Sequence, residues 1–184
     1  MNQARLGSAG RLGMRLFLLS LSILFAASLV GILVVRAKAP SWPPPGAPSL
    51  PQGLWLSTAL ILLSSWTLWR AQKSWAHGGE VRVAGWLMAT SLLALVFLAN
   101  QTVSWLAMAP AVKATATALY AFSFFLLTVL HAVHVLGGLV SLGFVTAKAR
   151  RGSLTQQGLN YAALYWHFLT VVWLVLFAAL KLLL

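Results

Sequence analysis

The stretches FFLLTVLHAVHVLGG (residues 124–138) and ALYWHFLTVVWLVLF (residues 163–177) are too apolar for anything but membrane-spanning segments. They place His131, His134 and His167 inside these segments. A polar ring in hydrocarbon is costly, so such residues normally face protein, bound lipid or water and have partners there. The three histidines therefore indicate a buried and specific contact surface.

The composition of the chain also indicates a membrane protein. Of its 184 residues, 60% are hydrophobic and 8% are charged, whereas a water-soluble domain has about a quarter charged residues. The only acidic residue is Glu80, and the absence of cysteine excludes disulfides and thiolate metal sites. The net charge of +12 comes from basic residues that flank apolar runs. This placement is typical of membrane orientation and of attraction to anionic head groups, so we expect no nucleic-acid partner.

Five segments are long enough to cross a hydrocarbon core, which needs about 20 apolar residues. The sequence therefore predicts an all-α bundle of five transmembrane helices that forms one integral membrane domain. The expected spans are residues 16–35, 54–69, 84–107, 118–145 and 160–183. The proline-rich residues 40–51 cannot be helical, because proline has no amide donor and restricts its predecessor. We expect an extended external strap there, with Trp42 at the membrane interface, and a hydrophilic loop at residues 70–83.

The distribution of lysine and arginine predicts the orientation of the chain. Most of the 13 basic residues lie at the N-terminus, in the second loop and in the fourth loop. The positive-inside rule then places the N-terminus in the cytoplasm and the C-terminus outside, which agrees with an odd number of spans. Residues 37–39 resemble a signal-peptidase site, and cleavage there would leave four spans. The preceding apolar run disfavours this alternative, because cleavable signals have apolar stretches of about 7–15 residues.

The two histidine-containing spans allow several interpretations. One side of the fourth span, at spacings of three and four, carries Thr128, His131, His134, Gly138 and Ser141. A small-xxx-small pair, Gly137 with Ser141, would let a neighbouring helix approach, and His167 on the fifth span can face this side. The rings can therefore form a packing seam, contact lipid phosphate, or hold a b-type haem through His131 or His134 with His167. A metal site is disfavoured, because the spans contain no acid to act as an outer partner for a ligating imidazole.

The same segments resemble subunit III of the haem-copper oxidases, the cytochrome c and quinol oxidases. The family's penultimate helix has a phenylalanine-rich start, a His-x-x-His pair and glycines, which match Phe124, Phe125, His131, His134, Gly137 and Gly138. Its last helix reads Tyr-Trp-His-Phe, then an acid and Val-Val-Trp, which match Tyr165, Trp166, His167, Phe168, Val171, Val172 and Trp173. The first span resembles the family's Gly-Met-x-Leu-Phe opening. The strap and the following LWLSTALILLSSWTLW (residues 54–69) are similar to the short five-helix bacterial members.

Two membrane carboxylates of that family are missing from this chain. Leu21 occupies the position of the glutamate in the first span, and Thr170 occupies that of the aspartate in the last span. A lone buried carboxylate is expensive, so the scaffold can survive its replacement by leucine or threonine. Roles that depend on those acids are not carried over, and the chain resembles a divergent member.

The resemblance implies a non-catalytic accessory subunit of a proton-pumping terminal oxidase in a bacterial cytoplasmic membrane. The implied partners are oxidase subunit I, subunit II and membrane phospholipids, with haems and copper in the catalytic subunit and no cofactor or metal in this chain. Tyr165, Trp166 and Trp173 would be interface or lipid anchors. The full set of candidate lipid, subunit or helix contacts is His131, His134, His167, Tyr165, Trp166, Trp173, Gly137 and Gly138. The alternatives are an accessory subunit of a nitric oxide reductase and a small b-type membrane cytochrome.

Overall fold

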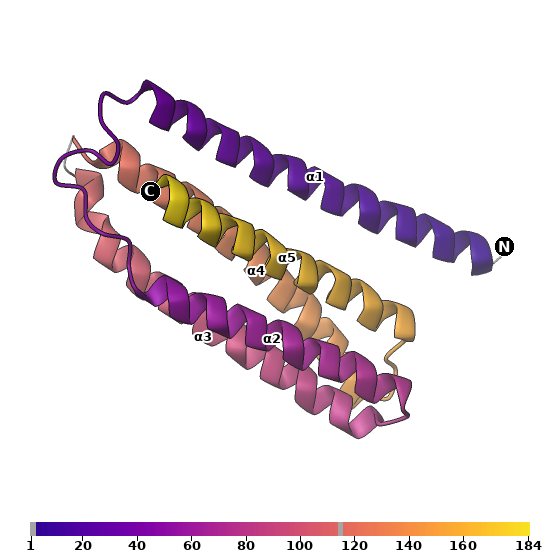
Figure 1. Cartoon of the computed structure of the whole chain (residues 1–184). Coiled ribbons are helices and arrows are strands. Elements are labelled where there is room, and N and C mark those ends of the chain that lie inside the picture. The colour runs from indigo at the N-terminus through magenta and orange to yellow at the C-terminus, as the bar shows by residue number, and fades with distance from the viewer. Residues whose placement is uncertain (1–2, 114–115) are drawn as a thin grey trace.

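The computed structural model describes residues 3–113 and 116–184, leaving out the side chains of residues 3–9, 80 and 81. All regular secondary structure in these residues is α-helical (Figure 1). The helices are α1 (Gln3–Lys38), α2 (Gly53–Ala76), α3 (Glu80–Lys113), α4 (Ala118–Arg150) and α5 (Gln156–Leu183). The predicted all-α architecture with five helices is therefore confirmed.

Four of the helices form a closed bundle. Helix α2 packs on α3, α3 on α4, α4 on α5, and α5 returns to α2. Helix α1 lies outside this bundle along α4 and α5, and within the described residues it makes no close approach to α2 or α3 (Figure 1). Successive helices run in opposite directions, so the start of α1 and the end of α5 lie at opposite ends of the molecule.

Length and apolar composition identify the membrane-crossing helices. Four described segments are long and apolar enough to cross a membrane: Gly10–Lys38, Arg82–Lys113, Ala118–Arg150 and Gln156–Leu183. The chain is therefore a multi-pass membrane protein. Helix α2 is not among these segments, and six hydroxyl residues lie within it, namely Ser57, Thr58, Ser64, Ser65, Thr67 and Ser74. With 24 residues it is about 36 Å long, which exceeds the roughly 30 Å of a hydrocarbon core.

The hydroxyl groups of α2 have hydrogen-bond partners on α3. The side-chain amides of Asn100 and Gln101 both donate to Ser57 Oγ, at 2.7 and 2.9 Å. Further along the two helices, the hydroxyl oxygens of Thr67 and Thr90 lie 2.8 Å apart. An unpaired polar group inside a bilayer costs several kcal/mol. These pairs therefore allow a comparatively polar helix to be buried among apolar ones.

Large apolar and aromatic side chains fill the interior of the bundle. Tryptophan and phenylalanine from α3, α4 and α5 meet leucine and isoleucine from α2 there. The largest fully buried side chains include Trp166, Trp173, Phe97, Phe124, Leu54, Ile61, Leu68 and Leu87. The core therefore lies between α2 and α5, while α1 contributes only a few buried residues along its inner side.

Helices α1 and α2 extend beyond the membrane spans expected from the sequence. Helix α1 begins at Gln3, well before residue 16, and α2 continues to Ala76. The hydrophilic loop expected at residues 70–83 is thus mostly helix, and the turn itself takes only residues 77–79. Gly78 has a φ of +72°, which glycine adopts without the strain that a Cβ would cause. Hydropathy marks the part of a helix that crosses the membrane, and polar residues extend these helices beyond it.

Helix α3 also exceeds its expected range of residues 84–107. It continues through Pro110 to Lys113, although proline in a helix interior removes one backbone hydrogen bond. The helix therefore continues beyond the end of the apolar run. Helices α4 and α5 likewise extend beyond residues 118–145 and 160–183 into basic and amide-rich turns.

The proline-rich strap contacts the end of the bundle where α5 finishes. The indole of Trp42 packs on Tyr120, with ring centroids 5.6 Å apart. The Trp42 Nε1–H donates to the carbonyl oxygen of Leu183. The Tyr120 hydroxyl lies 3.3 Å from the carbonyl oxygen of Pro48 and 3.2 Å from that of Leu184. Trp42 is half-buried and thus fastens the strap to the protein.

The contacts of Ser57 predict a loss of stability on substitution. Ser57→Ala removes the acceptor of both Asn100 and Gln101, so we expect it to reduce the free energy of unfolding by about 1–2 kcal/mol. Thermal unfolding in detergent, followed by circular dichroism, measures the change. Ser28→Ala is the matched control, because the Ser28 hydroxyl bonds only to Leu24 of its own helix. Equal midpoints for the two variants would contradict the proposed role of Ser57.

Candidate functional site

His131 lies at the centre of an aromatic cluster inside the protein. Its side chain is completely buried. The ring centroid lies 5.2 Å from Trp173 of α5, 5.9 Å from Phe97 of α3 and 6.3 Å from Phe25 of α1. We call His131, Trp173, Phe97 and Phe25 the aromatic seam. Within the described residues neither ring nitrogen of His131 has a hydrogen-bond partner. The contribution of this ring to the seam is thus packing against three other helices.

His134 lies one turn further along α4 and is only half-buried. Its Nδ1–H donates to the carbonyl oxygen of Leu130 at 2.7 Å, so the ring is bonded to its own helix. The ring also packs on Phe25, with centroids 5.3 Å apart. The Tyr165 hydroxyl donates to the backbone oxygen of His134 at 3.1 Å, and the Tyr165 ring packs on Phe17 of α1. His134 and Tyr165 therefore form part of the surface on which α1 lies.

The expectation that His167 meets the other two histidines is wrong. His167 Nδ1 lies 2.6 Å from Ser65 Oγ, so the imidazole hydrogen-bonds to α2. The neighbouring Trp166 occupies the side of α5 that lies against Gly138 of α4. Adjacent residues of a helix point about 100° apart. His167 therefore turns away from α4 because Trp166 takes the space there.

Trp166 and Trp173 are not interface anchors as expected. Both are completely buried within the bundle. Trp166 Nε1–H donates to Ser64 Oγ at 3.0 Å, and Trp173 Nε1–H donates to Thr58 Oγ1 at 3.0 Å. A buried indole normally requires a partner for its N–H, and α2 supplies both acceptors. These two bonds join α5 to α2 and close the four-helix bundle.

Gly138 is the residue that lets α4 and α5 approach. A Cβ at this position would lie 2.9 Å from Cε3 and Cζ3 of Trp166, closer than real Cβ contacts allow. A Cβ on Gly137 would lie 3.6 Å from the Tyr165 hydroxyl, an ordinary contact. The close approach therefore depends on Gly138 and the flat face of the Trp166 indole. At Gly137 a Cβ could be added without a clash.

Leu21 and Thr170, the positions at which the family resemblance implies carboxylates, are both buried. Leu21 packs in the apolar core where α1 meets the bundle. Thr170 Oγ1 donates to the Trp166 carbonyl oxygen at 3.1 Å, within its own helix. Each side chain therefore fits its buried position without a charge.

The histidines do not converge on a common ligand-binding space. His131 is enclosed by the aromatic seam, His134 bonds to its own helix, and His167 bonds to α2. Residues 3–113 and 116–184 contain no group of three or more His, Cys, Asp or Glu side chains that could hold a metal ion. A haem held between His131 and His167 would require both rings to turn into one cavity, which this packing does not provide.

Sequence reasoning missed the residues of α2 that complete the site. Thr58, Ser64 and Ser65 are the partners of Trp173, Trp166 and His167. The available signal was a run of hydroxyl residues in an otherwise apolar helix, since such residues bond across helices in membranes. Thr58 and Ser65, seven residues apart, lie on nearly the same side of α2, and Ser64 lies about 100° from Ser65, so the three residues cover a broad face of the helix.

Comparison with known proteins identifies the family. A family model described as Cytochrome c oxidase subunit III matches residues 4–182. A Cytochrome c oxidase subunit 3 of Synechocystis sp. is 30% identical over 176 residues, which cover 93% of this chain and 74% of the relative. The same subunit of Thermostichus vulcanus is 28% identical over 184 residues, covering 94% and 86%. A relative from Triticum aestivum is 38% identical over 148 residues, and the match covers 53% of its length.

The fold and the packed histidines define a multi-pass helical membrane protein whose buried polar residues join helices. The family match extends over almost the whole chain, and the chain therefore belongs to the cytochrome c oxidase subunit III family. The prediction of an accessory subunit III of a terminal oxidase is thereby confirmed.

The close approach of α4 and α5 at Gly138 predicts that a larger residue at this position destabilises the protein. Gly138→Ala places a Cβ against the Trp166 ring, so we expect a loss of about 1–3 kcal/mol in the free energy of unfolding. Gly137→Ala is the matched control, with ordinary contacts and a better helix former, so its stability should be unchanged or up to about 1 kcal/mol higher. Thermal unfolding of the purified chain measures both. Similar stabilities would show that α4 and α5 are not in this contact.

Proposed function

We propose that the chain packs against the catalytic subunit I of a bacterial terminal oxidase, together with subunit II, and stabilises it while holding phospholipid. The complex reduces oxygen in aerobic respiration, and this chain has no redox centre of its own. The observation that supports the proposal is that the three histidines of the membrane-spanning helices are engaged within the protein. Each of the three contributes to packing or to a bond within the protein, so no pair is left to ligate a haem.

The outer surface of the helices supports a partner-binding and lipid-binding role. Many large apolar side chains are exposed on every helix, with Leu106 of α3 70% exposed and Phe144 of α4 68% exposed. In a membrane this surface contacts lipid or other transmembrane helices. Helix α1 is the most open to such contacts, because only one side of it lies on the bundle.

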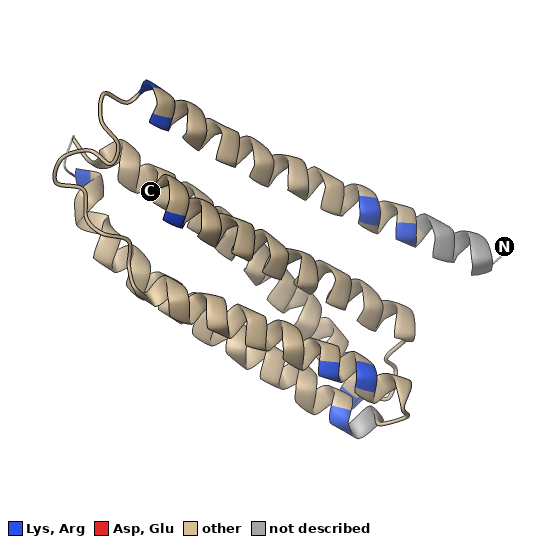
Figure 2. Cartoon of the chain, in the orientation of Figure 1, with Lys and Arg blue, Asp and Glu red and all other residues tan. Residues whose placement is uncertain are grey.

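We further propose that all five helices cross the membrane with the N-terminus in the cytoplasm. Figure 2 shows Lys and Arg gathered at the two ends of the described helices, with the middle free of them. The start of α1, the α2–α3 turn and the α4–α5 turn lie at one end. That end carries most of the basic residues, which favours the cytoplasmic side. Helix α2 crosses as well, because its hydroxyl groups are paired with α3 and α5.

Co-purification tests the proposed partner. The tagged chain, extracted from its native membrane in a mild detergent, is expected to bring with it a subunit that contains copper beside a high-spin haem. Visible spectra and metal analysis identify these centres. A partner with non-haem iron and no copper would instead assign the chain to a nitric oxide reductase. A Soret band that persists in the chain after separation from its partners would reject the accessory role in favour of a b-type cytochrome.

A further inference from the structure

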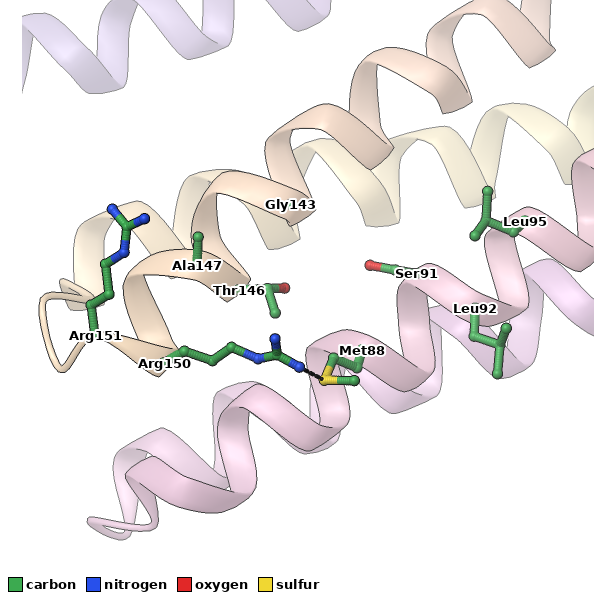
Figure 3. Close-up of a pocket in the computed structure, with 9 residues that line it drawn as sticks. All are labelled: Met88, Ser91, Leu92, Leu95, Gly143, Thr146, Ala147, Arg150 and Arg151. Carbon is green, nitrogen blue, oxygen red and sulfur yellow. Dashed lines mark hydrogen bonds between the residues drawn. The ribbon is translucent and has the colours of Figure 1, made fainter.

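A groove of about 530 Å³ lies between α3 and α4 near the end of α4 (Figure 3). Its volume falls within the range of about 300–1,000 Å³ that small-molecule sites occupy. The groove lies apart from the aromatic seam and from α1, which makes no close approach to α3. The lining residues are Met88, Ser91, Leu92, Leu95, Gly143, Thr146, Ala147, Arg150 and Arg151.

The walls of the groove are apolar. Helix α3 supplies Met88, Leu92 and Leu95, and α4 supplies the small residues Gly143 and Ala147. A Cβ on Gly143 would have no atom within 4 Å, so the space exists because α4 lacks side chains there. Small residues usually let two helices approach closely. Here they leave an open channel along the helix pair.

The hydroxyl groups in the groove are already satisfied. Ser91 Oγ donates to the carbonyl oxygen of Leu87 at 3.0 Å, and Thr146 Oγ1 donates to that of Leu142 at 2.7 Å. Both bonds stay within one helix. A ligand in the groove therefore meets mainly apolar surface, which suits a hydrocarbon chain that lies along the helices.

The end of the groove carries two guanidinium groups. Arg150 extends across the groove toward α3, where its Nη2 donates to Met88 Sδ at 2.7 Å, and Arg151 points away from it (Figure 3). A thioether is a weak acceptor, whereas a guanidinium has five donors. The described residues offer Arg150 no other acceptor. The sequence contains a single acidic residue, Glu80. The Arg150 charge is thus held over the groove without a strong partner.

We propose that this groove binds an anionic phospholipid. The phosphate accepts hydrogen bonds from Arg150 at the end of the groove, and one acyl chain lies against Leu92, Leu95 and Gly143. Arginine and phosphate form strong, charge-assisted bonds, which replace the weak contact with Met88. The excess of basic residues at this end favours an anionic over a zwitterionic lipid. The inference refines the proposed lipid-holding role. It requires only that α3 and α4 cross a membrane, so it stands even if the oxidase partner proves wrong.

Lipid titration of the purified full-length chain tests the site. Native mass spectrometry compares phosphatidylglycerol with phosphatidylcholine of the same acyl chains. We expect Arg150→Gln to weaken phosphatidylglycerol binding by about tenfold. Phosphatidylcholine has the same phosphate, but its choline cation offsets the charge, so we expect a smaller loss for that lipid. Lys148→Gln removes a charge from the same last turn of α4 outside the groove, and its effect should stay within about twofold. Equal losses in the two variants, or none in Arg150→Gln, would overturn the proposal.

Filling the groove provides a second, independent variant. Gly143→Leu adds a side chain to the open channel, where its Cβ meets no atom within 4 Å, so we expect weaker binding of both lipids. Gly31→Leu is its control, because a Cβ on Gly31 of α1 also meets nothing within 4 Å. Both variants are expected to unfold at the temperature of the parent protein. Undiminished lipid binding by Gly143→Leu would place the lipid elsewhere and overturn the assignment.

Two further measurements separate a lipid from other occupants. Inorganic phosphate should not displace phosphatidylglycerol, and displacement would show a simple anion site. The chain contains no cysteine, so Leu92→Cys introduces a unique thiol in the groove. In the intact complex this thiol should react only with lipid-soluble reagents. A disulfide cross-link to a cysteine of another subunit would show that a protein helix covers the groove, and would overturn the proposal.

Discussion

The structure depends on one constraint, which is that a polar group placed in hydrocarbon is costly unless it has a partner inside the protein. Among the described residues the ring of His131 is an exception. The two indole N–H groups of α5 meet this constraint by donating to Thr58 and Ser64 of α2. These bonds tie the last helix to the second and so close the bundle. The amides of α3 bond to α2 from the other side. Helix α2, with its hydroxyl groups, thus becomes the one to which α3 and α5 are joined.

The family and the number of helices could be predicted from the sequence, because apolar runs and two dense motifs suffice for that. The direction of His167 could not. Its spacing allows a place against α4, but only the packing of Trp166 on Gly138 shows that this place is already taken. The ends of the helices could not be predicted either, because polar residues continue α2 to Ala76 beyond the end of its apolar run. Local patterns give the helix, and contacts between helices decide which side faces which neighbour.

The absence of membrane carboxylates fits the remaining polar network. The buried polar groups that join helices here are hydroxyls, amides, indoles and one imidazole, so this network works without charge. At the two positions singled out by the sequence, Leu21 adds to the apolar contact of α1 and Thr170 bonds within α5. Uncharged side chains thus provide the contacts at both positions.

The position of α1 has a consequence for how the protein is made. This helix precedes α2 to α5 in synthesis, yet the surfaces it packs on belong to α4 and α5, which are synthesised after α2 and α3. Until α4 has been made, α1 has no surface among the described residues of this chain on which to pack. Its side chains Phe17 and Phe25 then find Tyr165 and the two histidines of α4. Docking of α1 on the rest of the chain thus follows the synthesis of α4.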